Sequence, residues 1–475
     1  MELEKKFFEV AEEIRSLERK PSNEDLLLLY AWYKQATVGD NRTEKPGATN
    51  FKERAKWEAW TATKGMDKEE AMRRYIEKAR NYLSSSSEDA EKKKPPPPIM
   101  REMTVNREIV LVTGGSGFLG QHLIKELNEH CSDRIQEIRV ADKKLFRKFL
   151  DYEEKIHLTE HIVDCVEEDE MDGVLDGVTC VFNLCARRYS FDMYEDREKQ
   201  WEDSVIAAKI LLRLMKKHSV GWLVHVGDAL SVIGTDEDAQ QPVEQGTLQA
   251  PAAGSWILGP HGEAKFRAEE IVRRNNHKIM DNGLFMHTVV VRPSALYGEG
   301  DSVLVPHALR TSRKWGRYWR LGHGDNIFQT TYAGNCAAML LLAWRHLREQ
   351  PEQYGGEVFF CTESERCENY FDFIQPYVEE VAGVQLGPVV PYELAYAGAW
   401  LLEKLFHTLL LLDMYFPHDL PNTNMVRMVG GLNYHFSPKK SQLMMGWKPP
   451  YNPAHAKQRT LDWWRTNADW INIDV

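Results

Sequence analysis

The sequence predicts two folded modules joined by a spacer. The first is an all-α four-helix bundle, and the second is an α/β domain on a doubly wound parallel sheet with a smaller C-terminal substrate region. Three observations predict this: helical apolar periodicity through residues 1–83, a segment rich in serine, charge and proline at 84–107, and short β-branched runs alternating with helical stretches through 108–475.

The first module, residues 1–83, has the periodicity of four amphipathic helices. The expected spans are 7–17, 26–36, 51–64 and 68–82. Lys20-Pro21-Ser22 ends the first helix and caps the second, and Asp67 with Glu70 forms a capping box for the fourth. Four such helices in so short a stretch predict a small bundle.

The second helix places Tyr30, Tyr33 and Lys34 on one face, and the string YKQATVGD, the pair Lys56-Trp57 and then Tyr75 follow. Cations and hydroxyls suit a phosphate, and aromatic faces suit an adenine. The alternative is that these side chains are core aromatics and a solvated face. With these residues the whole module resembles the acyl-CoA-binding protein family.

The resemblance implies that the module binds a long-chain acyl-CoA. Tyr30, Lys34 and Lys56 would then hold the nucleotide 3′-phosphate, Tyr33 would stack on the adenine, and Tyr75 would line the nucleotide or pantetheine site. Apolar residues of the first helix would border the acyl chain, namely Phe7, Val10, Ala11 and Ile14. Arg15 stands where the family usually has a lysine.

The spacer, residues 84–107, contains four serines, a charge run and four prolines. Such a composition buries too little apolar area to offset the ordering of the chain, and the prolines stiffen it. We therefore expect a tether between independent modules.

The second module begins with the stretch VLVTGGSGFLG, Val110 to Gly120. A β-branched run that breaks into glycines and leads into a helix is typical of a dinucleotide site. Gly114 would permit the tight turn, Gly117 would let the backbone approach a pyrophosphate, and Gly120 would allow close packing of the helix. The alternative is a glycine turn of another α/β protein.

A second strand, Ile138 to Ala141, is predicted to end on Asp142, about 20 residues after the last glycine, where a ribose-binding carboxylate belongs. A carboxylate there would repel a 2′-phosphate and so favours NAD, with NADP less favoured. Lys143 and Lys144 weaken this preference, and a solvated charged turn is the alternative.

The alternation continues with predicted strands ending at 161–164 and covering 178–186, 222–227 and 286–292, and with a crossover helix over 206–218. The motifs TGGSGFLG, VFNLCA, RPSALYGEGD, TTYAGNCAAMLLLA and PKKSQLMMGWKPP together resemble extended short-chain dehydrogenases of the 3β-hydroxysteroid dehydrogenase/isomerase type. The resemblance covers the whole module and implies a Rossmann-type, NAD-dependent oxidoreductase acting on a sterol or steroid-like alcohol or ketone. Its cofactor residues would be Gly114, Gly117, Phe118, Leu119, Gly120, Asp142, Asp164 and Lys265.

The catalytic set departs from that family. The family's base is a tyrosine four residues before a lysine, whereas this chain has His261 and Lys265 in GPHGEAKFRAEE. The family's serine is replaced by Asp228 or Ala229, depending on register, with Ser231 two or three residues later. Ser204 stands where the family has a helix-kinking asparagine.

Two interpretations follow. In one, His261, whose ordinary pKa lies near 6.5, acts as the base, with Lys265 keeping it neutral and Asp228 orienting it. In the other, the domain keeps its cofactor but has lost hydride transfer, so the protein is an NAD- and acyl-CoA-binding sensor, carrier or scaffold.

Composition limits the remaining roles. A net charge of −11 argues against nucleic-acid binding. The seven cysteines are scattered without metal spacing, so we expect reduced thiols and no metal. The N-terminus lacks a secretory h-region and no apolar run is long enough to span a bilayer, so we expect a cytoplasmic chain that is not secreted.

Residues 394–416 form an apolar segment interrupted by three charges. Two placements are open for it. The segment could make peripheral contact with an intracellular membrane such as the endoplasmic reticulum, or it could pack over the substrate cavity as core. The sequence identifies no partner protein.

Overall fold

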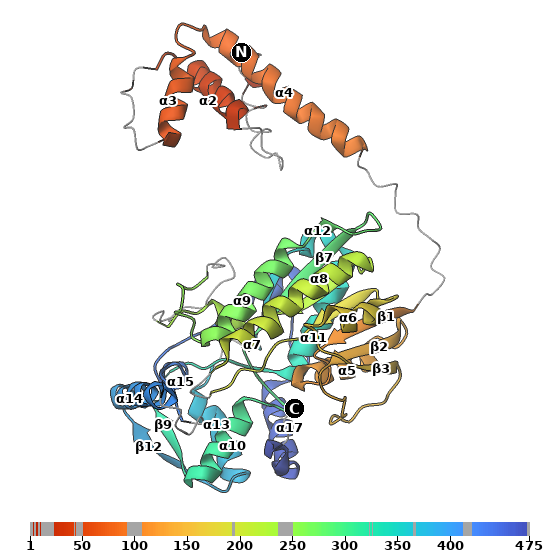
Figure 1. Ribbon diagram of the computed structural model, residues 1–475, viewed down its shortest axis with the longest axis vertical. Coiled ribbons are helices and arrows are strands. Elements are labelled where there is room, and N and C mark those ends of the chain that lie inside the picture. Colours follow the sequence, from red (N-terminus) through yellow and green to blue (C-terminus); the bar gives the residue numbers. More distant parts are fainter. Residues whose placement is uncertain are drawn as a thin grey trace. The chain divides into compact units, whose positions relative to one another are not determined.

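The computed structural model describes residues 3, 6, 7, 10, 23–41, 43, 51–92, 107–191, 195–235, 250–322, 324, 326–363, 367–411 and 420–472. The chain forms two compact units, Met1–Thr104 and Val105–Val475. Each unit is described by itself below (Figure 1).

The first unit contains three described helices, α2 (Asn23–Thr37), α3 (Phe51–Thr61) and α4 (Lys68–Lys92). Helix α2 packs against both α3 and α4. The core of this unit includes Phe7, Leu29, Ala71 and Tyr75, all of which are buried. Most of the predicted first helix lies outside the described residues, so the four-helix bundle itself stays a prediction.

Helix α4 extends beyond the end at Tyr82 that the sequence predicted. It reaches Lys92 because no glycine or proline interrupts the chain before Pro95. The serines at 84–87 lower helix propensity only slightly, which is too little to stop a helix already formed. The interpretation of residues 84–92 as the start of an extended spacer was therefore wrong.

The second unit is built on an eight-stranded sheet. Its path runs through β11 (Val358–Cys361), β7 (Phe285–Pro293), β5 (Trp222–Val226), β4 (Cys180–Asn183), β1 (Glu108–Thr113), β2 (Ile135–Asp142) and β3 (His157–Ile162). All neighbours on this path are parallel, and β6 (Lys278–Ile279) adds an antiparallel pairing to β7. The predicted doubly wound sheet is confirmed, and its strand order reverses direction between β1 and β4.

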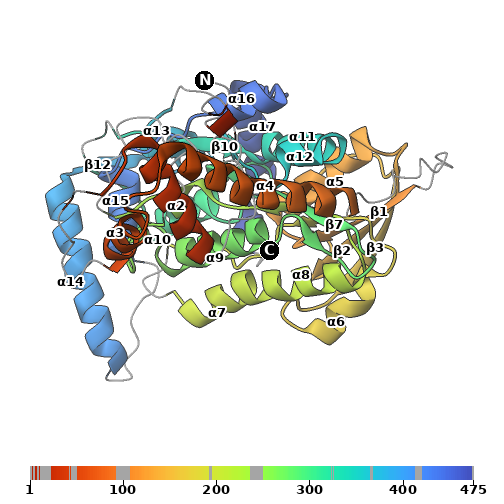
Figure 2. The ribbon, with the colours of Figure 1, turned by 90° about the horizontal axis from the view of Figure 1, so that it is seen from above.

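Both faces of the sheet are buried, as the nearly continuous apolar strands require. Val110 and Val112 of β1 face one layer of helices and Leu111 faces the other. The first layer is α5 (Phe118–His130), α11 (Ala333–Glu349) and α16 (Lys439–Met445); the second is α6 (Glu168–Asp172), α8 (Ala207–Lys217) and α9 (Gly259–Arg274). Figure 2 shows the sheet between α5 and α11 on one side and α6 and α8 on the other.

Helix α9 is held to the sheet by a buried ion pair. Arg292 at the end of β7 donates from Nε and Nη2 to the two carboxylate oxygens of Glu269 on α9, both at 2.6 Å. Both side chains are almost completely buried. Because His261, Lys265 and Glu269 follow one another at four-residue steps, the pair fixes the helical face that carries them.

The smaller region follows β7 and carries its own core. It contains two small parallel sheets, β8 (Ala295–Tyr297) with β10 (Thr330–Tyr332) and β9 (Tyr318–Leu321) with β12 (Leu386–Val390). Its helices are α10 (Leu304–Trp315), α13 (Tyr370–Glu380), α14 (Tyr392–Leu411), α15 (Thr423–Gly430) and α17 (Pro453–Thr466). Two further short helices, α7 (Arg197–Trp201) and α12 (Pro351–Tyr354), belong to the part of the unit around the main sheet.

Candidate functional site

A cavity of about 700 Å³ opens at the carboxyl ends of β1 and β4, where the strand order reverses. The glycine turn forms part of its wall. Gly114 has a φ of +68°, and a Cβ there would meet the backbone of Leu184 and Cys185 after β4 at 3.2 Å. A Cβ on Gly120 would lie 2.6 Å from the carbonyl oxygen of Gly114. Only glycines allow the turn, β4 and α5 to pack this closely.

The turn fits a pyrophosphate. Helix α5 begins after Gly117, whose backbone is extended and which supplies no side chain to cap the helix. The first backbone N–H groups of α5 are therefore available to an anion, and the helix dipole favours negative charge there. Phe118 and Leu119 also line the cavity.

The carboxylate of Asp142 lies at the end of β2 in the cavity wall. It accepts hydrogen bonds from the backbone N–H groups of Ser116 and Lys144, both at 3.1 Å. Burial raises its pKa, against the lowering effect of these hydrogen bonds. Asp142 is thus positioned beside the glycine turn, as a ribose-binding residue would be.

The neighbouring Lys143 is engaged by two carboxylates. Its ammonium lies 2.8 Å from Asp203 and 3.0 Å from Asp164. Partial burial opposes its charge, but these carboxylates raise its pKa above the ordinary value. Asp164 itself is outside the cavity wall, whereas Lys143 and Lys144 are part of it.

Lys265, Asp228 and His261 meet in the same cavity wall. The Lys265 ammonium donates to the carbonyl oxygen of Val226 at 2.7 Å, and burial lowers its pKa against the attraction of Asp228. Asp228 lines the cavity and Ala229 does not, while the Ser231 hydroxyl turns away to donate to the Asp228 carbonyl at 2.6 Å. The cavity wall therefore contains the Asp228 carboxylate at the position where the family has its serine.

The His261 imidazole is held neutral. Its Nδ1 lies 3.1 Å from Oε1 of Gln200, and the ring is also hydrogen-bonded to the backbone of Arg187. Burial, and then the charge of Lys265, lower its pKa to about 3. The pKa lies below the ordinary value near 6.5 because the ring is almost completely buried, and the ring is neutral at neutral pH.

Asp228 is the stronger base of the pair. Burial raises its pKa to about 6, against the opposing attraction of Lys265 and the hydrogen bond from the Leu230 N–H at 2.7 Å. Its Oδ2 lies 3.9 Å from Nε2 of His261, too far for a direct hydrogen bond. Both groups can instead contact one oxygen atom placed between them.

The segment that carries Gln200 departs from regular helix. Helices α7 and α8 are joined by a π-helical turn, Glu202–Ile206. This turn contains Ser204, at the position where the family has its kinking asparagine, and Asp203, the partner of Lys143. A π turn places one more residue in the helix than α geometry does, and such turns often occur at functional sites.

The rest of the cavity wall is largely apolar and comes mainly from the smaller region. It includes Phe191, Leu304, Phe328 and Met428. Tyr189 also lines it, with its ring centroid 5.6 Å from that of His261. The sequence analysis missed Tyr189, because a tyrosine in a loop after β4 carries no motif of its own.

Helix α14 contacts α15, where Glu403 accepts from the Thr423 hydroxyl and the Tyr396 hydroxyl accepts from Arg427, and its Ala399 and Phe406 are buried. The helix exposes Leu394, Trp400 and Leu401, which are 67%, 50% and 63% accessible. Among the described side chains of α14 none lines the cavity, which argues against the alternative that this part of the segment packs over the cavity as core. Residues 412–416 of the predicted segment lie outside the described residues. Within the described chain, no helix is both long and apolar enough to cross a bilayer.

The first unit brings together several residues that the sequence singled out. The Lys56 ammonium lies 5.6 Å from the Tyr30 ring centroid, and the Lys34 ammonium lies 4.6 Å from that of Trp60. Tyr33 and Tyr75 both contact the Phe7 ring, at centroid distances of 5.5 and 5.0 Å. Arg15, Ala11 and Ile14 lie outside the described residues.

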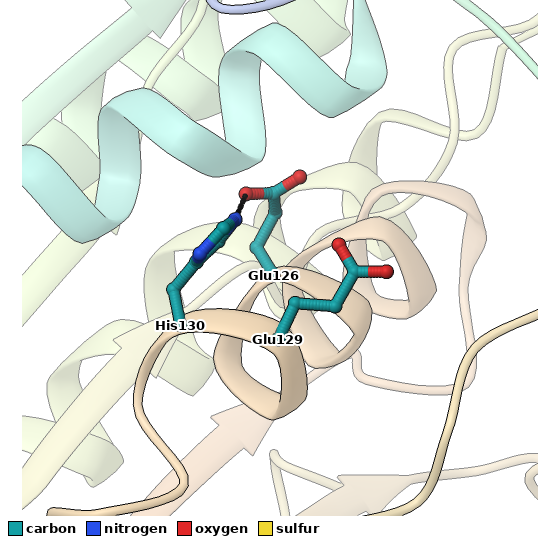
Figure 3. A group of neighbouring side chains, drawn as sticks. All are labelled: Glu126, Glu129 and His130. Carbon is teal, nitrogen blue, oxygen red and sulfur yellow. Dashed lines mark ion pairs between the residues drawn. The ribbon is translucent and has the colours of Figure 1, made fainter.

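Figure 3 shows the one cluster with metal-ligand spacing among the described residues, formed by Glu126, Glu129 and His130. Nε2 of His130 lies 3.4 Å from Glu126, whose carboxylate also accepts from the Tyr451 hydroxyl. The cluster lies at the opposite end of α5 from the glycine turn and is not part of the cavity wall. Because Glu126 is bound to both His130 and Tyr451, we interpret the cluster as a structural group.

Comparisons with known proteins agree with this architecture. Residues 4–79 match the family model of the acyl CoA binding protein. Mouse (Mus musculus) 3 beta-hydroxysteroid dehydrogenase type 7 is 26% identical over 358 residues, covering 75% of this chain and 95% of that protein. Sterol-4-alpha-carboxylate 3-dehydrogenase, decarboxylating, from Candida albicans is 27% identical over 376 residues, covering 76% and 99%.

Solved structures show the same fold. A dTDP-glucose 4,6-dehydratase from Streptomyces venezuelae, with NAD bound, superposes with a TM-score of 0.56 at 17% identity, covering 76% of this chain and 98% of that one. UDP-glucose 4-epimerase from Thermotoga maritima gives 0.54 at 17% identity, covering 76% and 99%. The model of the 3-beta hydroxysteroid dehydrogenase/isomerase family matches residues 111–393, more than half of the sequence, and the chain therefore belongs to that family.

Proposed function

We propose that the protein is an NAD-dependent oxidoreductase that interconverts a sterol or steroid-like alcohol and its ketone, and that its N-terminal module binds long-chain acyl-CoA. One observation carries the first part. A single cavity joins the glycine turn after β1 to Asp228, His261 and Lys265 and to a largely apolar wall. The named relatives, a 3 beta-hydroxysteroid dehydrogenase and a sterol 3-dehydrogenase, support this substrate class.

The proton step follows from the pKa values. With the pKa of Asp228 near 6 and that of His261 near 3, the carboxylate is ionised at neutral pH and is the stronger acceptor. In the oxidation direction a substrate hydroxyl between them would donate its proton to Asp228. The nearby ammonium of Lys265 would stabilise the negative charge on the substrate oxygen as the proton leaves.

His261 would position the substrate rather than take its proton. Its Nε2 would accept a hydrogen bond from a hydroxyl, while Gln200, 3.1 Å from Nδ1, would hold the ring in place. A bound nicotinamide would supply the hydride chemistry that interconverts the alcohol and the ketone. In the reverse direction protonated Asp228 would return the proton to the ketone oxygen.

We infer NAD rather than NADP as the cofactor. Asp142 lines the cavity beside the glycine turn, and its carboxylate would repel a 2′-phosphate on a ribose bound there. Lys143, a cation in the same wall, is paired with Asp164 and Asp203 and would offset this repulsion less than an unpaired lysine would. Lys144 also lines the cavity and works against the preference.

For the acyl-CoA module, the family-model match at 4–79 supports the assignment. The Lys56 ammonium lies 5.6 Å from the Tyr30 ring centroid, and a cation near a tyrosine suits the 3′-phosphate. Tyr33 and Tyr75, both in contact with Phe7, provide the aromatic surface for the adenine and pantetheine.

The exposed face of α14 supports peripheral contact with an intracellular membrane. The chain enters α14 directly after β12, which pairs with β9, and β9 carries Trp319, which is 47% accessible. Residues 304–321 around β9 contain five lysines and arginines and no carboxylate. Exposed tryptophan and leucine with nearby cations suit the surface of an anionic bilayer.

The protein is first titrated by calorimetry with NAD⁺, NADH and palmitoyl-CoA. Turnover is then measured from the absorbance of the reduced cofactor, with a panel of sterol and steroid alcohols and ketones. We expect both ligands to bind, turnover in the wild type, a rate at least 100-fold lower in Asp228→Asn, and a higher KM in His261→Phe. Absence of NAD binding by the wild type would refute the oxidoreductase assignment.

A second candidate is an NAD- and acyl-CoA-binding protein without turnover. The observation that favours it is the replacement of the family tyrosine by His261, whose low pKa makes it a poor proton carrier. Tight NAD and acyl-CoA binding with no turnover on any alcohol or ketone of the panel would establish this candidate instead.

A further inference from the structure

Two cysteine side chains lie together in the wall of the cavity. Cys165 comes three residues after β3, and Cys185 comes two residues after β4. Both line the cavity with the glycine turn and Asp142. Cys165 is buried and Cys185 is partly exposed, so Cys185 is the one that a small solute in the cavity would reach first.

The two thiols contact each other. The thiol of Cys165 is hydrogen-bonded to Cys185, and this contact, followed by burial, raises the pKa of Cys165. The Cys185 sulfur lies 3.7 Å from the carbonyl oxygen of Asp203 in the π-helical turn. The backbone of Cys185 packs closely against Gly114, and its N–H donates to the Thr113 hydroxyl at 3.4 Å. The pair is therefore attached to the parts of the chain that would surround the cofactor.

We propose that Cys165 and Cys185 are a modification site, a thiol pair that hydroperoxides oxidise to a disulfide inside the cofactor cavity. The Cys185 thiolate attacks one peroxide oxygen, the O–O bond breaks and water leaves after protonation, giving a sulfenic acid. The sulfur of Cys165 then attacks the Cys185 sulfur, the S–O bond breaks and a second water leaves. Overall, two thiols and one hydrogen peroxide give one disulfide and two waters.

The position of the pair predicts competition with the cofactor, and this part rests on the proposed NAD binding. A dinucleotide in the cavity would shield Cys185 from the peroxide. At an NAD concentration ten times its Kd about one site in eleven is free, so disulfide formation should slow about tenfold. Conversely, a disulfide would tie the loop after β3 to the loop after β4 and weaken NAD binding.

The chain supplies a matched control pair. Cys336 on α11 and Cys361 on β11 are also hydrogen-bonded to each other. Both are completely buried and neither lines the cavity. The two pairs share the same thiol–thiol contact and differ in access to the cavity, so peroxide should oxidise only the first.

The experiment treats the reduced full-length protein with hydrogen peroxide, with and without NAD⁺, and maps disulfides by mass spectrometry of peptides. We expect a Cys165–Cys185 disulfide that forms about tenfold more slowly with NAD⁺ at ten times its Kd. It should be reversed by dithiothreitol, absent in Cys165→Ser and Cys185→Ser, and retained in Cys336→Ser. Calorimetry should show weaker NAD⁺ binding to the oxidised wild type than to the same sample after reduction.

The proposal is overturned if Cys165 and Cys185 yield only sulfinic acids or stay reduced, if Cys336 and Cys361 oxidise equally fast, or if NAD⁺ binds and gives no protection. If the reduced protein binds no NAD⁺ at all, the proposed oxidoreductase function fails. The disulfide mapping with the serine variants then still decides whether the modification site exists.

Discussion

Replacing Asp228 by asparagine should make the second unit more stable and less active at once. The folded chain raises the pKa of this carboxyl from 3.8 to about 6, mainly through burial. Ionising it at neutral pH therefore costs up to about 3 kcal/mol, at 1.36 kcal/mol for each pH unit of the difference. Because the side chain is 24% accessible, we expect about 1–3 kcal/mol in practice.

The sign and the pH window follow from the direction of the shift. A carboxyl whose folded pKa is raised favours the folded state below pH 3.8, and this contribution is lost as the pH rises through 6. Asparagine resembles the protonated acid and keeps the oxygen that accepts from Leu230. The stability difference between variant and wild type should thus be near zero at pH 4, grow between pH 4 and 6, and be constant above pH 7.

The assay is urea unfolding of the full-length wild type and Asp228→Asn at several pH values, with the exposed Asp133→Asn as the matched control. The control should follow the wild type at every pH. Alcohol oxidation by the wild type should rise about tenfold per pH unit below pH 6 and then level off. The reasoning is refuted if Asp228→Asn is less stable at pH 7.5, or if its stability difference does not change with pH.

Three further variants test other contacts. Gly120→Ala places a Cβ 2.6 Å from the carbonyl of Gly114, so we expect about 1–3 kcal/mol of destabilisation and at least tenfold weaker NAD binding by calorimetry; unchanged affinity would contradict the tight turn. Arg292→Met leaves the Glu269 carboxylate buried without its partner and should cost about 3–5 kcal/mol in urea unfolding, most of which the double variant with Glu269→Met should restore. Lys56→Met should weaken the binding of palmitoyl-CoA about tenfold, since it removes a charged contact to the 3′-phosphate of about 1.5 kcal/mol. The affinity for the 3′-dephospho analogue should not change. An equal loss of affinity for both ligands would show that this lysine does not contact the 3′-phosphate.

The order of the main elements could be predicted because strong local signals mark them. The break from β-branched residues to glycines placed β1 and α5 within a few residues of their observed bounds. The helix predicted over 206–218 corresponds to α8 at Ala207–Lys217. The end of α4 was misplaced because serines weaken a helix without stopping it, so composition alone overstated the length of the spacer.

The candidate site was only partly predictable. Motif positions identified Asp142, Lys265 and His261, which all line the cavity. The pKa of His261 depends on burial by residues distant in sequence, and no motif reports this. Tyr189 and the pairing of Lys143 with Asp203 were missed for the same reason, because each depends on loops that only the folded sheet brings together.

The π-helical turn at Glu202–Ile206 makes the site sensitive to the helical phase of the segment before it. If the same residues of this turn adopted α geometry with no change in length, α7 would rotate by about 100° relative to α8, the rotation of one residue at 3.6 residues per turn. Gln200 would then swing away from the ring it holds, without any change in its own identity or in the hydrophobic pattern of either helix. Loss of π geometry in this one turn, at constant chain length, would thus be enough to remove the contact that Gln200 makes with the side chain at position 261.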